Sequence, residues 1–416
     1  MKRILLFFTF LPSLSFAQLT IERCQELARN HYPLIQRYGI IEKTTAYNIS
    51  NASKGYLPQF MLSAKASYQS DVTALPAQIS GIQIAGLPKD QYMVALDISQ
   101  SIWDGGAIER QKGVIKAGEA VEQAQVGVDL YALEKRVNQL FFGILLWEAQ
   151  LEQNRLLRVE LQRHYIMVDA CIESGMANLT DLDAVVVEQL RAQQLYHHLL
   201  SGKRAYREML SVMIGQTVDE SVTLEKPDPD ALFVSNQINR PELKLFDAQN
   251  QLFEIQKSAL TASYMPRLNL FVQGGYGRPG LNMLDNHFSP FYVGGIRFTW
   301  NFGALYTQKN DRFKLDLAQL NTETMRETFL YQTNLEVTQQ NIQLERIKKM
   351  VQYHNDIIAL REKIRRSAEA KVANGTLTVT ELMREVTSEN MAKQEKMVHE
   401  IELLMAIYDL KYTTNN

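Results

Sequence analysis

The stretch SGMANLTDLDAV, residues 174–185, returns two hundred residues later as NGTLTVTELMRE, residues 374–385. Each copy lies between two long stretches with helical periodicity. Four positions correspond in type between the copies: Gly175 with Gly375, Thr180 with Thr380, Asp181 with Glu381, and Leu182 with Leu382. The chain therefore contains the same glycine-centred turn twice, each time as a connection between helices.

Three further landmarks recur in the same order. HYPLIQ from His31 and NRPELK from Asn239 each open a helical stretch with a proline, which a first helical turn tolerates because its missing N–H would have no partner there. A second proline follows 25 residues later in each half, and WDGG from Trp103 then corresponds to WNFG from Trp300. Four landmarks in one order indicate an internal duplication.

Each half predicts a helix of about 25 residues, two strands, a helix of about 65 residues and a return helix of about 35. The first repeat covers 18–214, with strands at about 58–73 and 90–103 and a turn near 175. The second covers 238–416, with strands at about 266–278 and 290–302 and a turn near 375. Residues 215–237 between them are polar, contain two prolines and predict a linker with room for a short helix.

The predicted strands alternate between apolar and polar residues, as in FMLSAKASY from Phe60. Such alternation fits a soluble sheet with one wet face, and it also fits a barrel with lipid outside and water inside. Aromatic residues near the strand ends add modest support for the barrel, namely Tyr68, Tyr92, Tyr276, Tyr292, Trp103 and Trp300.

Apolar residues in the long helices follow a heptad-like spacing of three and four. One such seam contains Leu130, Leu133, Val137, Leu140 and Ile144. This spacing predicts helix-on-helix packing of the coiled-coil kind. A helix of 65 residues is roughly 100 Å long, so we expect an elongated molecule.

Residues 1–17 predict a cleaved secretory signal. Lys2 and Arg3 precede an apolar run from Ile4 to Leu11, and Ala17 closes a small-residue cleavage site. The apolar run is far shorter than the roughly 20 residues of a spanning helix, and no later segment is long and apolar enough either. Cys24 and Cys171 are expected to remain unpaired thiols.

Composition and motifs argue against nucleic-acid binding and against an enzyme. The 44 basic and 46 acidic residues nearly balance, without a basic stripe. Neither a P-loop nor a GxSxG motif occurs, and the seven histidines are scattered. His197 and His198 are adjacent, and neighbours on a helix face apart. We therefore predict no catalytic residue, no cofactor site and no metal site.

The ordered set of landmarks resembles the outer membrane efflux protein (TolC) family over the whole mature chain. GYLPQF and SYMPRL are similar to that family's motif before the barrel, and WDGG and WNFG to its motif between barrel and long helix. GMANLTDL and GTLTVTEL are similar to its paired periplasmic turns.

The resemblance implies a mainly α chain with a small membrane β part, assembled as a homotrimer in the outer membrane. Four strands cannot close a barrel, and open edges are not tolerated in lipid, so three copies would supply twelve strands. The long helices would continue as an α-barrel into the periplasm. The implied function is a passive export duct of a tripartite efflux or type I secretion system.

The implied partners are a periplasmic adaptor protein and an inner-membrane RND or ABC pump. The exported substrate stays open among drugs, metal ions and proteins. A second hypothesis also stays open: a secreted, elongated coiled-coil structural protein or adhesin whose strands form a soluble sheet.

The resemblance also implies site residues at the two turns. Gly175, Leu179, Gly375 and Val379 would form the tips that dock the adaptor. Thr180 and Asp181 match gate residues of the first hairpin, and Glu381 matches an acidic residue that rings the pore. Arg384 stands at the next acidic position, and Val372 and Leu377 replace a tyrosine and an arginine that lock the gate in well-known members.

Two simpler interpretations of the acidic residues stay open. Asp181 could be a helix cap after the turn, and Glu381 could lie on a solvated face. Arg384, three residues beyond Glu381, could instead pair with it and neutralise the ring.

Overall fold

The computed structural model describes residues 19–72, 89–173, 175, 177–229, 235, 237–283 and 285–416. The predicted signal segment, 1–17, lies outside the described residues. The chain divides into two compact units. The first contains Met1–Gln36, Val126–Pro241 and Glu327–Asn416, and the second contains Arg37–Gln125 and Glu242–Arg326.

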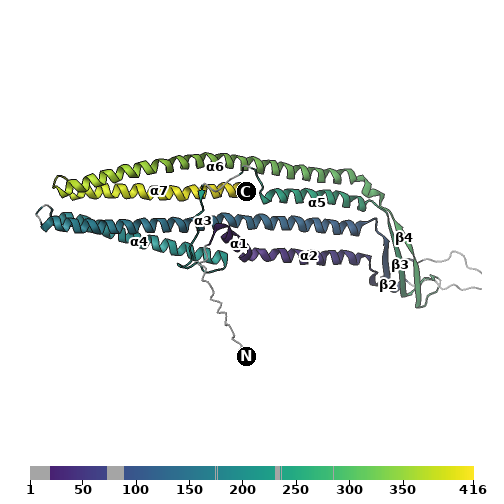
Figure 1. The fold of residues 1–416 in the computed structure, drawn as a ribbon. Coiled ribbons are helices and arrows are strands. Elements are labelled where there is room, and N and C mark those ends of the chain that lie inside the picture. The colour runs from purple at the N-terminus through teal and green to yellow at the C-terminus, as the bar shows by residue number, and fades with distance from the viewer. Residues whose placement is uncertain are drawn as a thin grey trace, which may run out of the picture. The chain divides into compact units, whose positions relative to one another are not determined.

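The described residues are mainly helical, with one small antiparallel sheet, as the sequence predicts. The α-helices are α1 (Ile21–His31), α2 (Gln36–Ser53), α3 (Ala107–Glu173), α4 (Leu179–Ile214), α5 (Pro241–Ser263), α6 (Gln308–Ala373) and α7 (Val379–Thr414) (Figure 1). The long helices α3 and α6 have 67 and 66 residues, and each contributes residues to both units. None of the helices in the described ranges has the length and apolar character needed to cross a bilayer.

The sheet belongs to the second unit and brings strands of both repeats together. Its order is β1 (Gln59–Tyr68), β2 (Asp90–Trp103), β3 (Arg267–Arg278) and β4 (Ser289–Thr299), all antiparallel. β1 stops at Tyr68, before the predicted end near 73. β4 stops at Thr299, before the predicted 302, because Phe302–Tyr306 forms a 3-10 turn ahead of α6.

The glycine motif at residues 103–106 fixes the passage from β2 into α3. Gly105 and Gly106 have φ values of +70° and +81°, which L side chains rarely adopt. The carboxylate of Asp104 accepts hydrogen bonds from the N–H groups of Gly106 and Ile108, at 2.8 and 2.7 Å. Asp104 therefore supplies partners for N–H groups that the start of a helix leaves unpaired.

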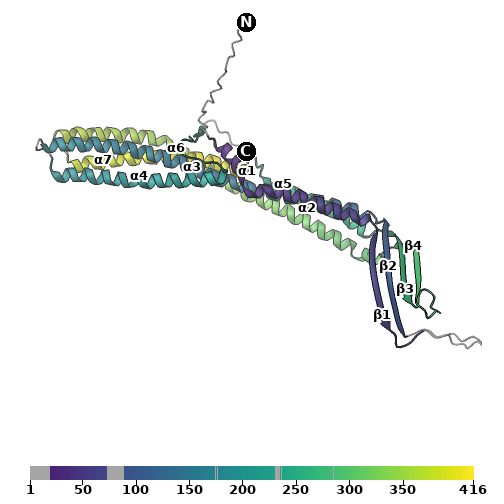
Figure 2. The ribbon, with the colours of Figure 1, turned by 90° about the horizontal axis from the view of Figure 1, so that it is seen from below.

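The first unit contains α4, α7 and the parts of α3 and α6 that pair with them, as two helical hairpins, α3 with α4 and α6 with α7. These four helices run side by side toward the two turns (Figures 1 and 2). Their apolar core near the turns takes residues from all four helices, including Leu161, Val185, Val372 and Leu382. The buried residues Leu130, Val137, Leu140 and Ile144 of α3 confirm most of the predicted heptad seam.

The predicted linker packs onto this first unit. Leu19 pairs with Leu224 in a parallel bridge, and its N–H donates to the carbonyl of Thr223 at 3.0 Å. The guanidinium of Arg207 donates to the carbonyls of Asp219 and Val222 and also contacts Glu148. Cys24 and Cys171 are both buried, and neither is part of a disulfide within the described residues.

Candidate functional site

The turn between α6 and α7 is built around the backbone of Gly375. Its φ is +70°, its N–H donates to the carbonyl of Val372 at 2.9 Å, and the N–H of Thr376 donates to Lys371 at 2.9 Å. These two bonds form a Schellman motif, which satisfies carbonyls that the end of a helix leaves unpaired. Gly175 has the same left-handed backbone, with φ +76° and a bond to Ile172 at 3.0 Å.

Glycine is needed at both turns for its backbone and not for close helix approach. A Cβ built on Gly175 or Gly375 would meet nothing within 4 Å. The space beside both glycines is therefore open within the single chain. What they supply is a positive φ, which costs an L residue roughly 1–2 kcal/mol.

Both return helices begin with a capping box, in which two side chains exchange hydrogen bonds with each other's backbone. In α4, the Asn178 side chain accepts from the N–H of Asp181, and the Asp181 carboxylate accepts from the N–H of Asn178, both at 3.1 Å. In α7, Thr378 and Glu381 form the same pair at 3.3 and 3.1 Å.

The capping box fixes the role of the two acidic residues within the chain. Asp181 is not itself the cap, since Asn178 occupies that position, but it is the reciprocal partner. The pKa of Glu381 lies below its usual range, first because of the hydrogen bonds from Thr378 and least because of Arg384. The Glu381 carboxylate therefore stays charged at neutral pH, and Glu381, Thr180 and Arg384 are exposed.

The remaining predicted tip residues separate into surface and core. Leu179, the first residue of α4, is 70% exposed, whereas Val379, the first residue of α7, is 4% exposed and belongs to the four-helix core. Val372 is also buried in that core, and Leu377 packs against it. The structure does not put Val379 on the surface, so its side chain is unavailable for docking in this conformation. Gly175 and Gly375 share a left-handed backbone, but the first residues of the helices that follow them differ in exposure.

Behind the turns lies a buried ionic cluster that the sequence analysis missed. Glu389 of α7 is 2% exposed and contacts Arg365 and Lys393, both at 2.5 Å. Arg365 also contacts Glu369 at 2.7 Å and Glu160 at 3.3 Å. His164 of α3 also lies beside Glu160 and Glu369. The i, i+4 spacing of Glu160 and His164 is visible in the sequence, but that spacing does not predict the approach of Glu369 from α6.

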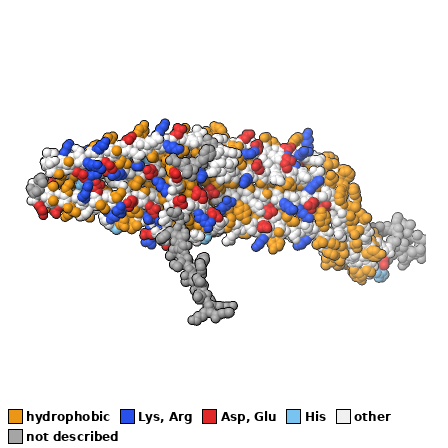
Figure 3. Space-filling view, in the orientation of Figure 1, with side chains coloured by type: hydrophobic (Ala, Val, Ile, Leu, Met, Phe, Trp, Pro, Cys, Tyr) orange, Lys and Arg blue, Asp and Glu red, His pale blue; other side chains and the backbone are white. Residues whose placement is uncertain are grey.

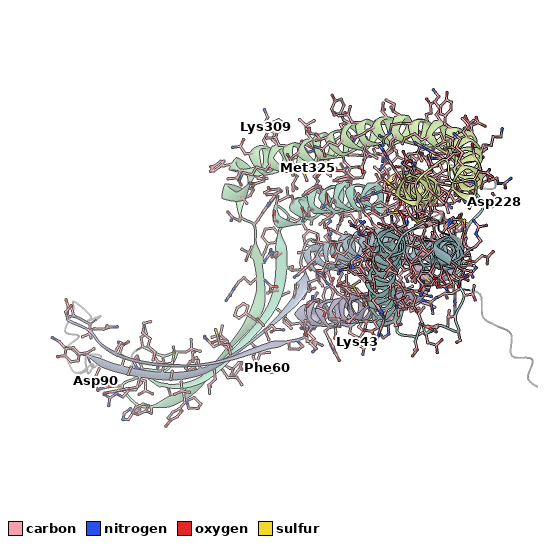
Figure 4. All side chains as sticks on the ribbon, turned by 90° about the vertical axis from the view of Figure 1, so that its left-hand side faces the viewer. Lys43, Phe60, Asp90, Asp228, Lys309 and Met325 are labelled. Carbon is pink, nitrogen blue, oxygen red and sulfur yellow. The ribbon has the colours of Figure 1, made fainter. Side chains whose placement is uncertain are left out.

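The second candidate region is the sheet, whose register gathers most of the large apolar residues on one face. Phe60 pairs with Ile98, Ile98 with Val272, and Val272 with Gly294. The same row-by-row pairing aligns the other apolar positions, namely Leu62 with Leu96, Val94 with Tyr276, Leu270 with Ile296, and Leu268 with Phe298. Orange side chains gather over the strands in Figure 3, and Figure 4 shows side chains leaving both faces of the curved sheet, with Phe60 and Asp90 labelled on it.

The opposite face of the sheet is mixed, since it carries polar side chains together with the apolar Phe271, Phe291 and Val293. Gln273 donates to the carboxylate of Asp97 at 2.7 Å, and the guanidinium of Arg297 lies 4.7 Å from the ring centre of Phe271. Apolar side chains on the first face stay open to solvent in the single chain, among them Phe60, Leu62, Val94, Tyr292 and Ile296. A contiguous apolar face of this extent marks a surface that another apolar phase covers.

Both edges of the sheet are open. Among the described residues, β1 pairs with β2 alone and β4 with β3 alone. Such edges offer unpaired N–H and C=O groups to another strand.

Comparisons with known proteins agree on the fold. No family model matches the sequence, and no curated protein matches it. The solved structure of CusC superposes with a TM-score of 0.68 at 12% identity, covering 95% of this chain and 91% of that one. The MtrE outer membrane channel of Neisseria gonorrhoeae, in its open state, superposes with a TM-score of 0.65 at 14% identity, covering 95% of this chain and 89% of that one. The outer membrane protein VceC of Vibrio cholerae superposes with a TM-score of 0.62 at 12% identity, covering 95% of this chain and 94% of that one.

These likenesses span nearly the whole of each chain, so they concern the complete architecture. At such low identity they establish the fold and leave the chemistry of individual side chains to the chain itself.

Proposed function

We propose that this chain, which has the fold of the outer membrane channels, works as a passive outer-membrane export channel whose sheet is the membrane-spanning part. The observation that carries the proposal is the apolar face shared by all four strands, opposite a face that holds the charged and polar residues Asp97, Gln273 and Arg297. In a barrel, the apolar face would contact lipid on the outside and the opposite face would contact water on the inside.

Closure of that barrel requires further copies of the chain. Unpaired strand edges are not tolerated in hydrocarbon, so β4 of one copy would pair with β1 of the next. Three copies would give twelve strands, an even number that leaves a water-filled lumen.

The helices of the first unit support the same head-to-tail contact. One face of α6 carries exposed apolar side chains at helical spacing, namely Tyr331, Leu335, Ile342, Tyr353, Ile357, Leu360 and Ile364. On α4, Leu179, Val187, Leu190, Met209 and Val212 are also exposed. Packing α6 of one copy on α4 of the next would cover both faces, and such a heterologous contact closes into a ring if its rotation permits.

The turns are proposed as the periplasmic end, where an adaptor protein of a tripartite system docks and a pump of the RND or ABC class supplies the substrate. Gly175, Leu179 and Gly375 offer exposed turn surface for that contact. Three copies of Glu381 and Asp181 around the axis would form an acidic entrance that favours cations. At about 6 Å and an effective dielectric near 20, each carboxylate pair would repel by roughly 3 kcal/mol.

The test compares two arginine substitutions at neighbouring positions of β1. Leu62→Arg puts a charge on the proposed lipid face and should sharply reduce the amount of heat-modifiable oligomer in outer-membrane fractions, because a lipid-facing Arg at mid-bilayer costs about 2–4 kcal/mol. Ser63→Arg, on the polar face, should leave that amount near the wild-type level.

Recovery of the wild-type chain from the culture medium or the soluble periplasm would favour the secreted structural protein instead. Equal membrane yields from the two arginine variants would contradict the assignment of the faces.

A further inference from the structure

The buried cluster behind the turns contains three side chains in an arrangement suited to a metal ion. Glu160 and His164 lie one helical turn apart on the same face of α3, and Glu369 approaches from α6. The Nε2 atom of His164 is 3.9 Å from a carboxylate oxygen of Glu160 and 3.8 Å from one of Glu369. The three potential ligand atoms all lie within 4.8 Å of one another.

His164 lacks the partners that a buried imidazole normally has. Its side chain is 1% exposed, and neither Nδ1 nor Nε2 has a hydrogen-bond partner in the described structure. Buried polar groups are nearly always hydrogen-bonded, and an unpaired one costs free energy. Burial also lowers the pKa of His164 to about 4, so the imidazole keeps a free lone pair at neutral pH.

The distances are close to those across a bound ion. Bonds of about 2.0–2.1 Å in tetrahedral geometry hold ligand atoms about 3.3–3.4 Å apart. The two distances to Nε2 of His164 would each shorten by roughly 0.5 Å, and the carboxylate oxygens, within 4.8 Å of each other, would approach by at most roughly 1.5 Å. Glu160 and Glu369 are half-buried, so rotation of their side chains suffices for such a shift.

Two arginines compete for the same carboxylates. Arg163 contacts Glu369 at 2.6 Å and Glu160 at 3.6 Å, and Arg365 contacts both as well. Arg163 is 61% exposed and is free to turn toward water, while Arg365 would keep its contact with Glu389. A cation would therefore replace an ion-pair arrangement that leaves His164 unsatisfied.

We propose that Glu160, His164 and Glu369 form a binding site for a divalent first-row transition ion such as Zn²⁺. One imidazole nitrogen and two carboxylate oxygens suit Zn²⁺, whereas Cu⁺ prefers thiolate and thioether ligands and Ca²⁺ and Mg²⁺ prefer oxygen alone. Sites of this kind are built in helix bundles from side chains on facing helices. The ion would tie α3 of the first hairpin to α6 of the second, near the turns, and this inference does not depend on the membrane proposal.

The test uses the full chain, purified in detergent with a tag that contains no histidine and stripped of metals by a chelator. Titration calorimetry with Zn²⁺ should give one ion per chain, and X-ray absorption of the bound zinc should show scattering from one imidazole. His164→Leu and the isosteric Glu369→Gln should each weaken binding at least about 10-fold, because loss of even an outer-shell partner of a metal ligand typically costs about 10–100-fold.

His354→Leu, which removes another buried histidine from α6, serves as the matched control and should keep the wild-type affinity. Circular dichroism of the metal-free variants verifies that they fold. If His164→Leu does not fold, Glu369→Gln alone tests the proposal. The proposal fails if the wild-type chain binds less than one zinc, if the bound zinc has no imidazole, or if folded Glu369→Gln binds as tightly as wild type.

Discussion

The carboxylate of Glu381 accepts hydrogen bonds from both the backbone N–H and the hydroxyl of Thr378, at 3.1 and 2.9 Å. The residue expected to ring the pore is thus held at the start of α7 by its own helix cap. Capping and lining a pore do not exclude one another, because the carboxylate remains charged and exposed. The cap has consequences for stability that can be measured without any transport assay.

Loss of the cap side chain should loosen the start of α7. Thr378→Ala removes the hydroxyl that accepts from the N–H of Glu381 and should cost about 1 kcal/mol of local stability. Hydrogen exchange of the first turn of α7 should accelerate accordingly. Thr380→Ala, two residues on and also exposed, is the control and should leave exchange in that turn nearly unchanged.

The contribution of Glu381 should depend on pH in a defined direction. Its folded pKa is lowered from 4.5 by the hydrogen bonds from Thr378, so its stabilising effect is fully present above pH 4.5 and is lost as pH falls through the folded pKa. Thermal melts of wild type and Glu381→Gln should therefore differ at pH 7 and converge in strong acid. A gap that widens in acid would mean that Glu381 is not held as a carboxylate in the folded chain.

The turn glycines should tolerate substitution according to backbone preference and not according to size. Space around Gly375 is open, so Gly375→Ala suffers from its positive φ alone and should lose about 1 kcal/mol of unfolding free energy. Gly375→Asn should lose less, because asparagine visits this conformation more readily. Chemical denaturation should rank the unfolding free energies as wild type, then Gly375→Asn, then Gly375→Ala. Equal stability of the alanine variant and wild type would contradict the prediction.

The bulky variant Gly375→Trp tests the docking role separately. If the turn docks an adaptor, this change should abolish export while leaving oligomers in the membrane. Normal export would mean that the turn is only a connector.

The two thiols should not react with a thiol label in the folded chain, and both should react in the unfolded chain. Cys24 and Cys171 are buried thiols outside any disulfide of the described residues, and burial raises the pKa of Cys24 to about 12. Because the thiolate is the reactive form, a maleimide at neutral pH should leave folded protein unmodified. Mass spectrometry after unfolding without reductant should find two labels per chain, whereas an unlabelled chain would indicate a disulfide.

Local patterns were enough to predict the elements of this fold. Proline and glycine landmarks marked where helices begin and turn, and period-two alternation marked the strands, because these features depend on neighbouring residues. The sequence also placed most apolar residues of each strand on one face, although Met61, Phe271 and Phe291 lie on the other. Strand ends were less certain, since the 3-10 turn at Phe302 gives no distinct pattern.

Features that depend on packing between distant segments escaped the sequence. Leu179 and Val379 occupy equivalent positions after their turns, yet one is exposed and the other buried, because the core near the turns takes more residues from α7 than from α4. His164 and Glu369 come together through the tertiary packing of α3 and α6. Neither arrangement leaves a trace in local spacing.

The central claim is that copies of this chain close one barrel through β1 and β4, and edge-to-edge cross-linking in isolated outer membranes tests it most directly. In a Cys24→Ser, Cys171→Ser background, Ser63→Cys on β1 is combined with single cysteines along residues 293–297 of β4. Oxidation should give, for at least one register, covalent products that stop at three chains, because a closed ring has no free edge. Absence of cross-links at every register, or a ladder that continues beyond three, would contradict the account.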